Sequence, residues 1–215
     1  MIDWEPLFTK SRRRTVLIGV HIEQHLNDFD AWFKIYKEDA ARKAVLADYG
    51  MRSLRVLQDV EDPNHCFVVM EAPDTEAVDK FQNDPRIKAR LEDLADHFAM
   101  PRKLLGMYNP HILESADENL ISLVEHHINN LDAWIEIFKE GAARKPVMAE
   151  YGITVVRLLE NIENRNHCIT AWAVPDAEAA GKMQADPRAV AQREKISEHV
   201  IKPPEIIGTF KIHLV

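Results

Sequence analysis

The sequence has few cysteines: Cys66 and Cys168 are the only two in 215 residues, and neither belongs to a CxxC motif. Each lies in an apolar run, so we expect two small buried thiols inside strands. A disulfide between them stays open, although a reducing compartment argues against it. The chain therefore offers no cysteine motif for a metal or for redox chemistry.

Long apolar runs and a strong positive charge are missing too. No segment reaches the roughly 18 apolar residues that a membrane helix needs. The N-terminus lacks the apolar core of a signal peptide, so we expect a cytoplasmic protein with no membrane partner. A formal net charge of −8 argues against nucleic acid as the main partner. The short basic run Lys10–Arg14 lies in an N-terminal tail, residues 1–14, that we expect to be loosely held.

Familiar catalytic motifs are absent as well. The chain has no glycine-rich phosphate loop, no GxSxG elbow and no zinc-ligand spacing. We therefore expect no cofactor and no metal, and no single motif proves that the protein is an enzyme.

The chain does contain an internal repeat, with an offset of 102 residues (134 − 32 for the central tryptophans). Such repeats define the architecture before any other feature does. They predict a first unit at 15–110, a linker at 111–118 and a second unit at 119–215. The matching segments are Asp30-Ala31-Trp32 with Asp132-Ala133-Trp134, Tyr49-Gly50 with Tyr151-Gly152, Asn64-His65-Cys66 with Asn166-His167-Cys168, and Asp84-Pro85-Arg86 with Asp186-Pro187-Arg188.

Each unit predicts the order strand, helix, strand, strand, helix, strand. This α+β order is the ferredoxin-like βαββαβ arrangement, a four-stranded antiparallel sheet with helices on one face. The second unit is the obvious cover for the other face, so we expect the two to pack sheet to sheet as an internal pseudo-dimer; a further homodimer stays open. Pro146 predicts that the first helix breaks before a short extra turn. In the first unit we expect strands at 15–23, 51–58, 65–72 and 103–108, and helices at 30–43 and from 85 to about 98; in the second, strands at 120–125 and 153–160.

These features resemble the dimeric α+β barrel superfamily, here as a tandem duplication within one chain. Its members include antibiotic-biosynthesis monooxygenases, small cyclase-like proteins, muconolactone-isomerase-like proteins and haem-binding enzymes. The resemblance implies a pocket between sheet and helices, lined by Asn, Trp, Tyr, His and Arg side chains. It rests on the strand that ends at His25, the Asp30-Ala31-Trp32 helix start, the Tyr49-Gly50 helix end, Arg55-Val56-Leu57, Asp62-Pro63-Asn64 and Asp84-Pro85.

Glu23 and His25 lie two residues apart on a predicted strand, so both side chains point to one face. If His65 and Arg55 reach the same face, an acid, a base and a cation come together. A histidine is a suitable base for an acidic phenol or enol, and an arginine can stabilise the anion that forms. We therefore predict His25, His127, Arg55 and Arg157 as catalytic, and Glu23, Glu125, Trp32, Trp134, Tyr49, Tyr151, His65 and His167 as ligand-binding.

Other interpretations of this cluster stay open. It could be a structural network of ion pairs and hydrogen bonds where the two halves meet. Glu23, His25 and His65 also form a set of two histidines and one carboxylate, which a metal could use if all three came within bonding distance.

The predicted function is the binding of a small molecule. A cofactor-independent monooxygenase, an isomerase or a cyclase acting on an aromatic or polyketide-like acid fits the resemblance. A non-catalytic ligand carrier, or a structural protein that binds other proteins, is the alternative of a different class. This fold supports many chemistries, so neither substrate nor reaction follows from the sequence.

Overall fold

The computed structural model describes residues 17–116, 119–140, 145–195 and 197–215, so the predicted tail lies outside the described residues. Within these residues, eight antiparallel strands close into one barrel in the order β1-β3-β2-β8-β5-β7-β6-β4. The strands are β1 (Ile18–His25), β2 (Arg52–Asp59), β3 (His65–Ala72), β4 (Lys103–Ile112), β5 (Leu120–Ile128), β6 (Thr154–Asn161), β7 (His167–Ala173) and β8 (Val200–Leu214).

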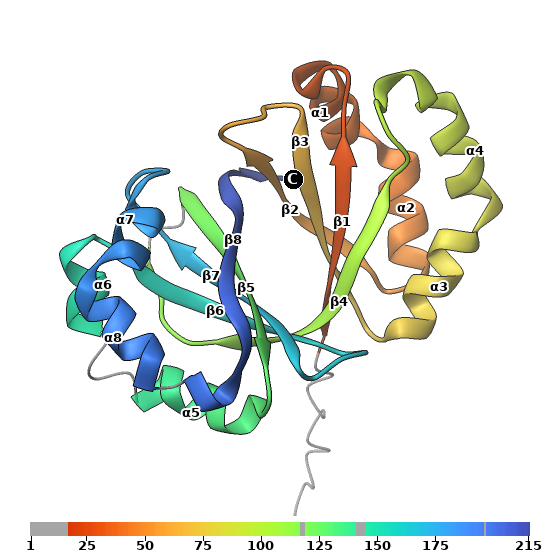
Figure 1. Ribbon diagram of the computed structural model, residues 1–215. Helices are drawn as coiled ribbons and strands as arrows, with labels where there is room; N and C mark the ends of the chain where they lie inside the picture. Colours follow the sequence, from red (N-terminus) through yellow and green to blue (C-terminus); the bar gives the residue numbers. More distant parts are fainter. Residues whose placement is uncertain (1–16, 117–118, 141–144, 196) are drawn as a thin grey trace, which may run out of the picture.

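The helices lie outside the barrel in two groups, one beside each half of the strands (Figure 1). The order of elements in residues 18–112 recurs in residues 120–214. The helices are α1 (Phe29–Glu38), α2 (Ala40–Asp48), α3 (Thr75–Asn83), α4 (Pro85–Asp93), α5 (Leu131–Glu140), α6 (Lys145–Glu150), α7 (Ala179–Ala185) and α8 (Pro187–Lys195), with 3-10 turns at Ala95–His97 and Ser197–His199.

Two seams between strand edges join the halves into one barrel. At the first seam β2 pairs with β8, and at the second β4 pairs with β6. Each seam satisfies backbone groups that would otherwise form an open sheet edge. The prediction of an α+β protein is thus confirmed as an eight-stranded antiparallel barrel with outer helices.

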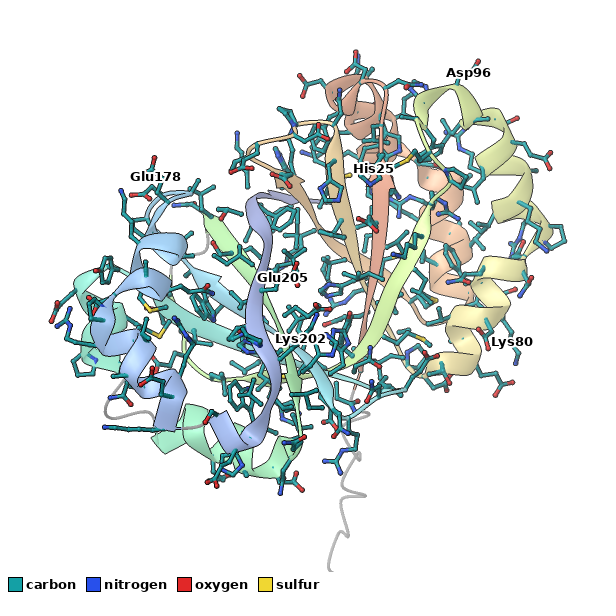
Figure 2. All side chains as sticks on the ribbon, in the orientation of Figure 1. His25, Lys80, Asp96, Glu178, Lys202 and Glu205 are labelled. Atoms are coloured by element: carbon teal, nitrogen blue, oxygen red, sulfur yellow. The ribbon has the colours of Figure 1, made fainter. Side chains whose placement is uncertain are left out.

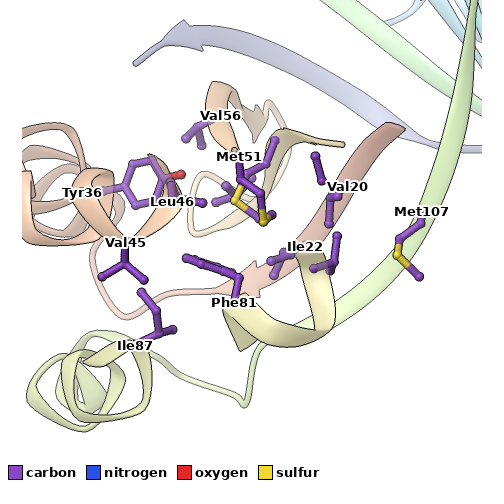
Figure 3. Close-up of a cluster of buried hydrophobic side chains, with 14 of the residues drawn as sticks. Val20, Ile22, Tyr36, Val45, Leu46, Met51, Val56, Phe81, Ile87 and Met107 are labelled. Carbon is purple, nitrogen blue, oxygen red and sulfur yellow. The ribbon is translucent and has the colours of Figure 1, made fainter. Parts of the chain in front are cut away.

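Three apolar layers form the core of the described part of the chain. One packs the outer face of the first-half strands against α1–α4, and Figure 3 shows Val20, Ile22, Tyr36 and Phe81 within it. A second repeats this arrangement under the helices of the other half. The third fills the barrel and takes buried side chains from both halves, among them Phe67, Leu123 and Phe210. Because side chains alternate along a strand, neighbouring residues point alternately to helices and to the barrel interior.

The first helix differs from its predicted bounds of 30–43. It stops at Glu38, and Asp39 begins α2 by accepting the backbone amide of Arg42 at 2.9 Å. The Asp39 carboxylate is buried and pairs with Arg90 at 2.8 Å, and this contact fixes the break. In the second half, Pro146 lies in the first turn of α6, where proline is tolerated because its missing amide has no helical partner to lose.

Other boundaries follow the sequence more closely. The strand predicted at 65–72 is confirmed, and Asp84 caps α4 with Pro85 in its first turn as expected. Gly50 and Gly152 both have φ of 67°, the left-handed conformation predicted for them. The strand predicted at 103–108 instead continues to Ile112, two residues into the expected linker, because it pairs with β6 there.

No helix in the described segments is both long enough and apolar enough to cross a membrane.

Candidate functional site

The polar cluster predicted around His25 forms on the barrel-facing side of the sheet. Val20 and Ile22 of β1 pack under the helices, so Glu23 and His25, which alternate with them, face the barrel. His65 begins β3 directly opposite His25 in the ladder. Its ring forms T-shaped pairs with two barrel side chains, with centroids 5.1 Å from Phe67 and 6.2 Å from Phe210.

Glu23, His25 and His65, here called the first cluster, converge on one carboxylate oxygen. Glu23 Oε1 lies 3.2 Å from His65 Nε2 and 3.7 Å from His25 Nε2. The two imidazole rings stack with centroids 4.6 Å apart and planes 14° from parallel. Figure 2 shows His25 at the end of β1.

Glu125, His127 and His167 form a second cluster of the same design. Glu125 Oε1 lies 2.9 Å from His167 Nε2, and Glu125 Oε2 lies 3.3 Å from His127 Nε2. The two histidine rings stack with centroids 5.0 Å apart. In each cluster the candidate ligand atoms all lie within 4.8 Å of one another, close enough in space for a set of metal ligands.

The two clusters differ in the residues behind them. In the first, His65 Nδ1 lies 3.1 Å from Asp59 Oδ2; in the second, His167 Nδ1 lies 3.2 Å from Asn161 Nδ2. A lysine also differs, because Lys103 Nζ is 3.9 Å from Glu23 whereas Lys202 Nζ is 3.3 Å from Glu125. The two clusters therefore have different electrostatic settings.

Within each cluster the histidines differ in exposure. The side chains of His25 and His127 are 32% and 30% exposed, whereas those of His65 and His167 are 13% and 14% exposed. The exposed histidines, His25 and His127, can therefore meet a ligand. The more buried ones, His65 and His167, are each held between two polar side chains.

The Glu125 carboxylate is well placed to stay ionised. Burial alone would raise the pKa of Glu125, but hydrogen bonds from Lys202, His167 and His127 outweigh burial and lower it. A carboxylate that keeps its charge at neutral pH can stabilise an adjacent imidazolium.

Arg55 and Arg157 lie half-buried at equivalent positions of β2 and β6. In the ladders they stand opposite Val69 and Ala171, which belong to the barrel layer, so both arginines face the barrel. The positive charge of Arg55 is felt inside the barrel, where it adds to the effect of burial in lowering the pKa of His21 to about 4.

The predicted aromatic residues do not join the histidines. Trp32 is buried under the helices and stacks on Tyr36 with centroids 4.7 Å apart, and Trp134 lies in the equivalent layer. The Tyr49 hydroxyl donates to Asp84 at 2.9 Å, and that of Tyr151 donates to Asp186 at 3.0 Å. The resemblance implies one pocket between sheet and helices for these residues and the histidines. The sheet instead separates Trp32 and Tyr49, on its helix side, from His25 and Arg55, on its barrel side.

Two barrel residues were missed by the sequence analysis. His21 and Tyr108 meet inside the barrel with ring centroids 5.1 Å apart. The Tyr108 hydroxyl is buried and has no hydrogen-bond partner among the described residues, and burial followed by the charge of Glu125 raises its pKa. The repeat held a signal for both residues. At the same offset of 102 residues, His21 corresponds to Leu123 and Tyr108 to Phe210. In each pair the residue of the first half has a polar group that its counterpart lacks.

No family model matches the chain, and no curated protein matches it in sequence. Solved structures do match it in fold. An anthrone oxidase-like protein is 12% identical with a TM-score of 0.59, covering 93% of this chain and 92% of that one. A predicted monooxygenase from Lactobacillus acidophilus is 14% identical with a TM-score of 0.55, covering 92% and 94%. A chlorite dismutase from Candidatus Nitrospira defluvii is 13% identical with a TM-score of 0.53, covering 92% of each.

These likenesses, all below 25% identity, show the fold. The expected likeness to proteins with the dimeric α+β barrel fold is confirmed.

Proposed function

We propose that the protein binds a small aromatic or polyketide-like acid at the rim of its barrel and removes a proton from it. The two Glu–His–His clusters carry this proposal, because each brings two imidazoles onto one carboxylate at a partly exposed edge. A cofactor-independent monooxygenase, an isomerase or a cyclase would each begin with such a step. The names of the anthrone oxidase-like and monooxygenase neighbours favour the first of these.

His25 and His127 are the proposed bases because they are the more exposed histidines of their clusters. The neutral imidazole takes the proton, and Glu23 or Glu125 stabilises the imidazolium that results. His65 and His167 hold the carboxylates in place: His65 lies against the same Glu23 oxygen as His25, and His167 lies against the Glu125 oxygen that His127 leaves free. In the same proposal, Arg55 and Arg157 provide positive charge for the substrate anion.

The same proposal covers the organisation of the chain. We infer two ferredoxin-like repeats, at 15–110 and 119–215 with a linker between them, and a cytoplasmic setting. The strand order supports the repeats, since β4-β1-β3-β2 and β8-β5-β7-β6 have the same connectivity.

Anthrone is a suitable first probe, because loss of its acidic C–H proton yields an anion that O₂ can oxidise. The overall reaction, anthrone plus O₂ giving anthraquinone plus water, is balanced without a cofactor. Oxygen uptake and anthraquinone absorbance together measure turnover by the untagged full chain. If one half works, either His25→Gln or His127→Gln should abolish turnover; if both work, each should lower it partially.

His199→Gln is the matched control, because His199 has the same 32% exposure and pairs with a glutamate at 3.5 Å, yet lies outside both clusters. Its turnover should equal that of the unchanged protein. If the unchanged protein binds the probe, as measured by fluorescence, but does not convert it, the carrier alternative would replace the enzyme proposal.

A further inference from the structure

We propose that the first cluster, Glu23, His25 and His65, binds one divalent transition-metal ion, whereas the second cluster does not. This inference goes beyond the proposed function, and a metal titration tests it without any substrate. While a metal ion is bound to the first cluster, His25 is a ligand and not a base, so the proposed proton transfer then belongs to His127 of the second cluster. Two imidazoles and a carboxylate form a common ligand set for zinc, iron and related metals. Although the same three residue types meet in both clusters, the atoms behind them prepare only the first for a metal.

The first cluster provides an acceptor for the tautomer of His65 that a metal ion needs. Asp59 Oδ2 lies 3.1 Å from His65 Nδ1, and an ionised carboxylate can only accept a hydrogen bond. Glu23 Oε1 lies 3.2 Å from the other ring nitrogen, Nε2, so His65 has an acceptor on each side. When a metal takes the Nε2 lone pair, the ring proton stays on Nδ1 and is donated to Asp59. This carboxylate–histidine arrangement is the one that orients histidine ligands in metal sites.

The second cluster has the opposite tautomer. Asn161 Oδ1 accepts the backbone amides of Glu163 at 2.9 Å and Asn164 at 3.0 Å, and this turn fixes which amide atom faces the histidine. Asn161 Nδ2 therefore donates to His167 Nδ1. The ring proton lies on Nε2, where it donates to Glu125 at 2.9 Å. A nitrogen that carries a proton cannot bind a metal.

A lysine strengthens the difference. Lys202 Nζ lies 3.3 Å from Glu125 and 3.6 Å from Glu205, so an ammonium already occupies the place of a cation in the second cluster. Figure 2 shows Lys202 and Glu205 on the same strand, β8. Position 202 corresponds to Met100 in the first half. The lysine of the first cluster, Lys103, is 3.9 Å from Glu23 with a side chain 73% exposed, so it can turn into solvent when a metal binds.

Three protein ligands leave coordination positions open, as in catalytic rather than structural sites. The exposed side of the first cluster, where His25 lies, would direct those positions toward water or an oxygen of a small molecule.

Metal titration of the untagged full chain, stripped beforehand with a chelator, tests the inference directly. Calorimetry with Zn²⁺ and visible absorption with Co²⁺ should each give one site per chain. Glu23→Gln and His65→Gln should abolish binding. Asp59→Asn, which gives the first cluster the second cluster's residue, should weaken binding by roughly 10- to 100-fold. Melting temperatures measured without metal show whether each variant folds. If Glu23→Gln or His65→Gln does not fold, His25→Gln, which changes the ligand at the exposed edge, takes its place and should abolish binding.

The reciprocal change provides the matched gain of function. Asn161→Asp together with Lys202→Met gives the second cluster the first cluster's residues, and the titration should then show two sites. No binding of Zn²⁺ or Co²⁺ to the unchanged chain would overturn the inference. Three other results would also overturn it. These are a metal affinity that Asp59→Asn leaves unchanged, two equal metal sites in the unchanged chain, and a single metal site after the reciprocal change.

Discussion

Gly106 lies against the ring of Tyr108: a Cβ at Gly106 would come within 2.7 Å of the Tyr108 hydroxyl oxygen and 2.9 Å of Cζ. The Tyr108 side chain is part of the layer that fills the barrel. We predict that Gly106→Ala lowers the free energy of unfolding by about 1–3 kcal/mol, because the buried ring must move. Denaturant titration measures the change.

Gly181→Ala is the control for this prediction. A Cβ at Gly181 would meet nothing within 4 Å, and the residue lies inside helix α7. Alanine favours a helix over glycine by roughly 0.8–1.0 kcal/mol, so this variant should be slightly more stable than the unchanged protein. Equal stability of Gly106→Ala and the unchanged chain would contradict the packing described for the barrel.

The two cysteines should be chemically inert in the folded protein. Both are fully buried and free, and burial raises the pKa of each thiol to about 12. Because the thiolate is the reactive form, Ellman's reagent at pH 8 should label neither cysteine until the chain is denatured, and then both. Rapid labelling of the native protein would show that the strands carrying Cys66 and Cys168 open easily.

The Asp84 carboxylate, which caps helix α4, should make the folded protein lose stability as the pH falls into the acid range. Its carboxylate accepts hydrogen bonds from Arg86 at 2.7 Å and from Tyr49 at 2.9 Å, and the Arg86 guanidinium holds the pKa of Asp84 well below its usual range. A lowered folded-state pKa contributes stability above the unfolded value of about 3.9, and this stability is lost as pH falls toward the lowered one. Asp84→Asn should therefore melt earlier than the unchanged protein at neutral pH.

The gap between the two melting temperatures should narrow below about pH 4, where the unfolded chain takes up the proton first. Asp186→Asn should behave in the same way, because Arg188 and Tyr151 hold Asp186 as their counterparts hold Asp84. A gap that stays constant from pH 7 to pH 3 would show that the charge of the cap contributes nothing.

A single half of the chain should not be stable as a monomer. Residues 15–112 alone would expose the edges of β2 and β4, which pair with β8 and β6 in the full chain. It would also expose the barrel-facing side of its own sheet. We expect this fragment to aggregate or to form a homodimer that rebuilds the barrel. A monodisperse, folded monomer in analytical ultracentrifugation would show that the half does not need the pairing of β2 with β8 and of β4 with β6.

The sequence predicted the fold well because its signals are local. The Asp84-Pro85 restart and the left-handed Gly50 depend on a few adjacent residues, and both appear as expected. The break in the first helix was predicted after residue 43 but lies at Asp39, whose buried carboxylate pairs with Arg90, 51 residues away. Contacts at such distances in sequence leave no local pattern.

The candidate site was predictable only in part. The i, i+2 spacing of Glu23 and His25 correctly puts both on one face of a strand. It does not say whether that face meets the helices or the barrel, and for that reason Trp32 was grouped with His25 although the sheet separates them. The repeat could have revealed one further contrast, since the residues behind His65 and His167 are Asp59 and Asn161.

The most direct test of the account is turnover of anthrone by the His25→Gln plus His127→Gln double variant. Glutamine keeps much of the size and hydrogen bonding of histidine but cannot serve as the base. We predict a native circular dichroism spectrum, an almost unchanged melting temperature and a fall in kcat/KM of roughly 10²- to 10⁴-fold, the usual contribution of a positioned base. Full activity in the folded double variant would contradict the assignment of the base, and gross unfolding would show instead that the two histidines are structural.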